Sequence, residues 1–145
     1  DTHPSGASMS GTTPEHTLET SAGLRAADRV VWTGLDRLPD PEIDVPSIII
    51  EFVSKRSRDR QRDYIDKRDE YLAIGVKEYW IIDRFQRQVV VYTPTGESKL
   101  PPESVYTTQL LPGFELAVSR ILDIADRYRQ PRPSRRTSKL KRPNA

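Results

Sequence analysis

The chain has 145 residues and a mass of 16.6 kDa, a length that suits one domain. It has no cysteine, which excludes disulfide scaffolds, thiolate zinc sites and cysteine nucleophiles. No apolar run approaches the roughly 18 residues of a membrane span and no secretory signal is legible, so we expect a cytoplasmic protein with no membrane partner. Both histidines, His3 and His16, lie in a polar N-terminal segment, which argues against histidine-based catalysis in the folded part.

Positive charge is concentrated at the C-terminus. Residues 127–145 hold eight of the 23 basic residues and none of the 21 acidic ones, so residues 1–126 carry a net charge of −6. We expect residues 127–145 to be a disordered basic tail that attracts polyanions such as nucleic acid, although plain solubilisation explains it equally well. Residues 1–21 are rich in Ser, Thr and Gly and predict a disordered polar leader, which leaves residues 22–126 as the domain.

The first elements of this domain are predicted to be strands followed by a helix. The run "RVVW" (residues 29–32) is β-branched and aromatic, and "SIIIEFVS" (residues 47–54) is apolar on both faces, as expected of a strand covered on both sides. The charged stretch from Arg58 to Ile74 predicts a helix. Gly75 then supplies the C-terminal position that tolerates a left-handed conformation.

The second half of the domain predicts two more strands and a last helix. The strands are "VKEYWIID" (residues 76–83) and "QVVVYTP" (residues 88–94), and the polar turn between them indicates an antiparallel hairpin. The last helix is predicted from about Val118 to Tyr128. Together these elements indicate the α+β class, with a mixed sheet.

Glu51 is the most informative residue, because it lies in the middle of the predicted strand 47–54. A carboxylate buried there must face a crevice, pair with a cation or bind a metal, and a salt bridge to an arginine is the ordinary explanation. On a helical projection, Lys67 and Arg68 both fall on the inner arc of the helix 58–74, where either could simply keep its charge in water. A lysine beside a strand glutamate also suits metal-assisted phosphodiester hydrolysis.

Such a site needs a second carboxylate. Position favours Asp28, because a residue at the start of a neighbouring strand can converge on Glu51. Acids in the connecting loop are usually solvated turn formers, and Asp44 is the alternative among them because it leads into the strand of Glu51. Asp63 could assist from the edge of the helix, or it could form a solvated i,i+4 pair with Lys67.

The segment "DVPSIIIEFVS…RDYIDKRDEYLAIGVKEYWIIDRF" (residues 44–85) resembles the Uma-type restriction endonuclease family of the PD-(D/E)XK nuclease superfamily. The resemblance extends over about residues 26–125, some two-thirds of the chain. The family pattern is a strand glutamate and a serine, then Asp, Lys and Tyr at four-residue steps, then "GV-EYW-D". The matching residues here are Glu51, Ser54, Asp63, Lys67, Tyr71, Gly75, Val76, Glu78, Tyr79, Trp80 and Asp83.

The resemblance implies roles for individual residues. Asp28 matches the first metal-binding aspartate and Glu51 the second metal ligand, and the backbone carbonyl of Phe52 would be a third. The superfamily lysine usually follows two residues after the acid, where this chain has Val53. Members of this family carry the lysine on the following helix instead, and Lys67 matches that position.

The resemblance also implies a restriction-endonuclease-like sheet flanked by helices and a Mg²⁺-dependent endonuclease acting on DNA, with Mn²⁺ as a substitute and a homodimer as one option. Only 27 residues precede Asp28, fewer than the family's N-terminal helix and strands require, which suggests a shortened domain. Two alternatives stay open. One is a catalytically inactive nucleic-acid-binding or interaction protein that binds through the basic tail, and the other is a structural domain with a buried Glu51–Lys67 ion pair.

Overall fold

The computed structural model describes residues 9–56 and 61–128. Its main sheet has six strands in the order β1-β2-β3-β4-β5-β6, and a second sheet pairs β7 with β8. The strands are β1 (Met9–Thr20), β2 (Gly23–Thr33), β3 (Ile48–Phe52), β4 (Glu78–Asp83), β5 (Gln88–Thr93), β6 (Gly96–Leu100), β7 (Val105–Tyr106) and β8 (Leu116–Ala117); the helices are α1 (Gln61–Ala73) and α2 (Val118–Tyr128). Only β3 and β4 are parallel in the six-stranded sheet, so the sheet is mixed.

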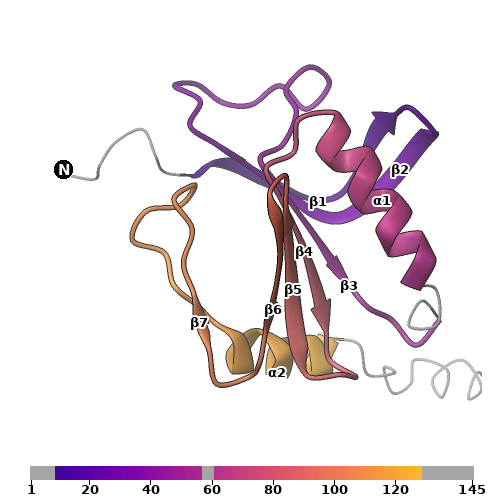
Figure 1. Cartoon of the computed structure of the whole chain (residues 1–145). Coiled ribbons are helices and arrows are strands. Elements are labelled where there is room, and N and C mark those ends of the chain that lie inside the picture. Colours follow the sequence, from indigo (N-terminus) through magenta and orange to yellow (C-terminus); the bar gives the residue numbers. More distant parts are fainter. Residues whose placement is uncertain (1–8, 57–60, 129–145) are drawn as a thin grey trace, which may run out of the picture.

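The two helices cover opposite faces of this sheet (Figure 1). Strand β3 shows how the sequence produces this arrangement, because successive side chains of a strand point to opposite faces. Ile49 and Val53 belong to the core cluster beneath α1, whereas Ile48 and Ile50 belong to the cluster beneath α2. Both faces of β3 are therefore covered, as its continuous apolar run predicted.

The predicted hairpin and helices are confirmed. Strands β4 and β5 pair antiparallel, and Asp83 closes the turn by accepting hydrogen bonds from the backbone N–H groups of Phe85 and Gln86, both at 3.0 Å. Helix α1 ends in a Schellman motif, in which Val76 N–H donates to the Tyr71 carbonyl at 3.1 Å. Gly75 has φ 108°, a left-handed conformation in which a residue with a Cβ would be strained.

The N-terminal segment differs from the prediction. Residues 9–20, assigned above to a disordered leader, form β1, which pairs with β2 from Met9↔Thr33 to Thr20↔Gly23. Polar composition hid this strand, because most of its side chains are exposed or half-buried and only Leu18 and Thr20 are buried. Its stability comes from the backbone ladder with β2, which a search for apolar periodicity does not detect.

His16 consequently lies in the folded part, contrary to the expectation from sequence. Its ring packs edge-on against Trp32, with 5.4 Å between the ring centroids, and partial burial lowers its pKa. The remainder of the predicted leader, residues 1–8, and the predicted tail from residue 129 onward lie outside the described residues. Arg127 and Tyr128, the first two residues of that predicted tail, end α2.

Candidate active site

The register between β2 and β3 brings Asp28 and Glu51 together. Arg29 pairs with Ile50 in this antiparallel ladder, so Asp28 and Glu51 come opposite each other where the ladder ends. The Asp28 carboxylate accepts a hydrogen bond from the Phe52 backbone N–H at 2.7 Å, and Glu51 is only 5% exposed. Two carboxylates from adjacent strands thus meet at one point.

Helix α1 brings a cation to this point. The Lys67 ammonium lies 3.1 Å and 3.3 Å from the two carboxylate oxygens of Glu51, and Tyr71, one turn later, donates its hydroxyl to Glu51 Oε2 at 3.4 Å. The helical projection could not choose between Lys67 and Arg68. In the structure, Arg68 pairs with Asp69 at 2.9 Å instead, so Lys67 is the residue that contacts the strand glutamate.

Burial leaves the charge of Glu51 incompletely compensated. Desolvation raises the pKa of Glu51 and the nearby negative charge of Asp28 adds to this effect, while Lys67 and Tyr71 oppose it. Burial and the charge of Glu51 also raise the pKa values of Tyr71 and Tyr79. Both phenols therefore stay protonated, and Tyr71 can act as a hydrogen-bond donor to the carboxylate.

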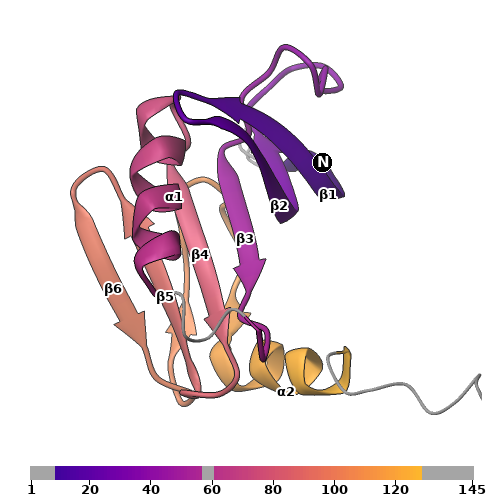
Figure 2. The ribbon, with the colours of Figure 1, turned by 90° about the vertical axis from the view of Figure 1, so that its right-hand side faces the viewer.

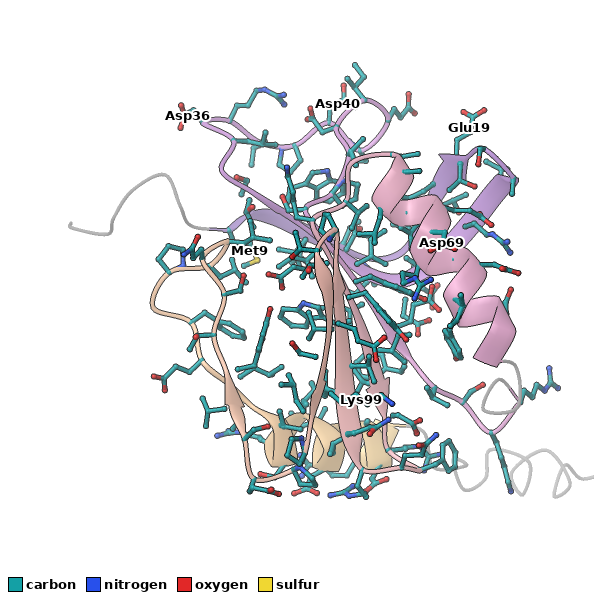
Figure 3. All side chains as sticks on the ribbon, viewed as in Figure 1. Met9, Glu19, Asp36, Asp40, Asp69 and Lys99 are labelled. Carbon is teal, nitrogen blue, oxygen red and sulfur yellow. The ribbon has the colours of Figure 1, made fainter. Side chains whose placement is uncertain are left out.

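The acids of the loop between β2 and β3 are placed elsewhere. Asp44 forms a bidentate ion pair with Arg37, at 2.6 Å and 2.8 Å, which lowers the pKa of Asp44 to about 2. Asp36 and Asp40 are exposed and lie on the outer part of this loop (Figure 3). Within the described part of the chain, no interaction links Asp44 to Glu51. Asp63, the other auxiliary candidate, approaches Lys67 to 3.9 Å.

Sequence reasoning missed the residues that tie α1 to the β1–β2 hairpin. Arg25 of β2 donates from Nε and Nη2 to the two carboxylate oxygens of Glu70, at 2.8 Å and 2.7 Å, and Thr20 donates to the same carboxylate at 2.8 Å. The hydrogen bonds from Arg25 lower the pKa of Glu70 to about 2. Arg25 also lies 3.7 Å from Asp63. Because Arg25 lay before the first strand we predicted, nothing in the pattern pointed to it.

The oxygen donors of this site fit a magnesium ion. No group of three or more His, Asp or Glu side chains in the described residues is arranged to bind a metal. The candidate donors are the carboxylates of Asp28 and Glu51 and the carbonyl of Phe52, whose N–H donates to Asp28. Mg²⁺ commonly binds through one or two carboxylates and keeps several waters, and two carboxylates and a carbonyl meet that requirement.

A mixed six-stranded sheet with a helix on each face is the fold expected of a restriction-endonuclease-like protein. Residues 9–119 match the model of the Uma2 family, described as "Putative restriction endonuclease". The chain belongs to this family. The matched region begins at the first residue of β1.

A solved structure supports the fold. The chain resembles the crystal structure of a putative nuclease belonging to DUF820 from Anabaena variabilis, with a TM-score of 0.64 and 15% sequence identity over 79% of this chain and 68% of that one. At this identity the likeness concerns the fold alone. No curated protein was found to match the chain. None of the described helices is long and apolar enough to cross a membrane.

Proposed function

We propose that this protein is a Mg²⁺-dependent endonuclease that hydrolyses phosphodiester bonds of DNA. The observation that carries the proposal is the contact of the Lys67 ammonium with buried Glu51, which lies opposite Asp28 on the neighbouring strand. Membership of the family supports a nuclease; DNA, the metal and the residue roles are our proposal. A homodimer, which would bring two such sites to the two strands of a duplex, belongs to the same proposal.

Each residue has a specific task in this mechanism. Asp28, Glu51 and the Phe52 carbonyl would hold the metal, and Mg²⁺ bound there would lower the pKa of the attacking water and neutralise phosphate charge. The Lys67 ammonium has three N–H donors, so it can contact Glu51 and still donate to a phosphate oxygen, where negative charge develops in the transition state. The Tyr71 hydroxyl keeps the Glu51 carboxylate oriented.

Nicking of supercoiled plasmid tests this proposal. Glu51→Gln and Lys67→Met should each reduce the Mg²⁺-dependent rate by about 100-fold or more, because each removes a charge that contacts the reacting groups. Asp36→Asn is the matched control, since Asp36 is an exposed loop acid, and it should nick like the parent protein. Parent-like activity in both site variants would overturn the proposal.

A catalytically silent binding protein is the second candidate, and the eight basic residues of 127–145 favour it. Binding would then come from phosphate contacts and would fall steeply with salt. A chain ending at residue 128 should lose DNA binding under this hypothesis, whereas a nuclease should retain metal-dependent binding. Calorimetric titration of Mg²⁺ into the parent protein and Glu51→Gln separates the nuclease, which should bind the metal only when Glu51 is present, from a structural ion pair, which predicts no metal binding in either protein.

A further inference from the structure

A cavity of about 270 Å³ adjoins the candidate site on the face of the sheet that carries α1. Val53 and Ile81 line it; Ile81 is the register partner of Glu51, and Val53 follows Glu51 by two residues on the same face. Two residues of a strand span about 7 Å, so the cavity begins one row of side chains beyond the Glu51 carboxylate. Tyr64, another lining residue, has its ring centroid 5.9 Å from the Lys67 ammonium.

The outer wall of this cavity is formed by the part of the sheet that α1 leaves open. Figure 2 shows β6 lying beside α1 and not beneath it. Tyr92 and Gln88 of β5 and Lys99 of β6 line the cavity, and Lys99 extends toward the α1 side of the sheet (Figure 3). Within the described residues, the Gln88 amide and the Lys99 ammonium have no hydrogen-bond or ion-pair partner, so they are available to a ligand.

The chemistry of the lining fits a nucleobase. Tyr64 and Tyr92 provide aromatic surface, although the Tyr92 ring already stacks on Tyr79, with 6.2 Å between centroids, and has the Arg68 guanidinium over it at 5.1 Å. An amide such as that of Gln88 can both donate to and accept from the edge of a base. Asp83 and Glu97 also line the cavity, and their carboxylates would repel a phosphate but can accept hydrogen bonds from base N–H groups. The volume lies just below the roughly 300–1,000 Å³ of pockets for drug-sized ligands, which suits one base.

We propose that this cavity binds one unstacked nucleobase of the strand whose phosphate lies at Glu51 and Lys67. The inference rests on the proposed function and adds a substrate preference to it. A base inside a duplex is stacked and paired, so filling the cavity requires single-stranded or locally unpaired DNA, or a base turned out of the helix. The enzyme therefore prefers single-stranded or unpaired DNA to an intact duplex.

The test combines a change in the protein with a change in the DNA. A fluorescently labelled short single strand of mixed sequence is titrated with protein, with Ca²⁺ in place of Mg²⁺, and the Kd is measured by anisotropy. A single abasic position is then moved along the strand. Parent protein should lose about 5- to 150-fold in affinity when one particular base is missing, the range expected for loss of one stacked base.

Two cavity variants, Gln88→Ala and Tyr92→Leu, should bind the intact strand more weakly than the parent protein does. Their affinity should fall little further when the strand lacks the base to which the parent protein is sensitive. Gln109→Ala is the matched control, because Gln109 is exposed and does not line the cavity. Melting curves confirm that each variant is folded. Equal loss from the missing base in the parent and the variants, or no loss at any position, overturns the inference.

The same proteins separate this inference from the proposed function. If Mg²⁺-dependent nicking requires Glu51 but the abasic scan is flat, the nuclease proposal stands and the base cavity is wrong. If neither nicking nor DNA binding is detected, both fail. A preference for duplex over single-stranded DNA in the parent protein also contradicts the base cavity.

Discussion

Two glutamates are buried in this protein, and their surroundings give them different roles. Glu78 accepts hydrogen bonds from three neutral donors, namely Trp80 Nε1 at 2.8 Å, the Tyr106 hydroxyl at 3.0 Å and the Thr108 hydroxyl at 2.5 Å. Glu51 instead contacts one ammonium and one phenol and lies near the second carboxylate, Asp28. Glu78 is therefore a satisfied structural group, whereas burial leaves the charge of Glu51 only partly compensated.

Replacing Glu51 by its neutral isostere should stabilise the protein. The raised pKa means that the folded chain binds more protons than the unfolded chain above the ordinary value of 4.5, so stability falls as pH rises through the folded-state pKa. Glu51→Gln removes this cost, so we expect its free energy of unfolding at pH 8 to be higher than that of the parent protein. Melting curves should show the gain shrinking toward pH 4.

Glu78→Gln is the matched control for that experiment. The three donors now share the two carboxylate oxygens of Glu78, and the substitution replaces one of these oxygens by an NH₂ group, which cannot accept a hydrogen bond. This variant should therefore be destabilised by about 1–3 kcal/mol. A Glu51→Gln variant that melts below the parent protein at pH 8 would show that the Lys67 ion pair outweighs the cost of burial.

At the scale of elements, the position of Lys67 depends on how α1 is held against the sheet. The β1–β2 hairpin extends beyond the sheet and lies beside α1 (Figures 1 and 2). Its Arg25 and Thr20 both bond to Glu70, which lies less than one turn after Lys67. Arg25 is thus a positioning residue, because it acts on the site only through α1.

Arg25→Met should weaken this attachment. A partly exposed bidentate pair is worth about 1 kcal/mol, so the free energy of unfolding should fall by that amount at pH 7. The pKa of Glu70 is lowered to about 2, so the pair contributes above the ordinary value of 4.5 and its contribution is lost as pH falls toward 2. Denaturant titrations at pH 7 and pH 3 should show the difference from the parent shrinking.

Arg37→Met provides the control, since Arg37 pairs with Asp44 in the loop between β2 and β3 and does not contact α1. Hydrogen exchange should become faster along α1 in Arg25→Met and stay unchanged there in Arg37→Met. Unaltered exchange in α1 of the Arg25 variant would argue against its role in holding the helix.

The elements also show what could be predicted from sequence. Strand β3, the β4–β5 hairpin and both helices carry strong local signals: an apolar run, a polar turn and a glycine cap. The contact between Glu51 and Lys67 could be predicted because β3 and α1 are consecutive elements of the chain. Strand β1 and the Arg25–Glu70 pair had no such signal, since one is polar and the other joins positions 45 residues apart.

At the scale of the whole molecule, the candidate site lies on the inner part of the sheet. Asp28 belongs to β2, which is paired on one edge with β3 and on the other with β1. Because β1 is polar, it contributes little apolar burial, but it pairs with β2 from one end to the other. Without it, the backbone groups of β2 along that edge would lose their partners, and the edge could pair with other chains.

A chain starting at residue 22, the predicted domain boundary, should therefore fail to fold as a monomer. We expect it to aggregate or to lose its cooperative thermal transition, because removal of residues 9–20 exposes the edge of β2 and removes buried Leu18 beside the core. The control is a chain starting at Met9, which retains β1 and should melt like the full sequence. Gel filtration and circular dichroism make the comparison. If the chain that starts at residue 22 is monomeric and its melting temperature is unchanged, β1 is dispensable and β3 alone holds Asp28 in place.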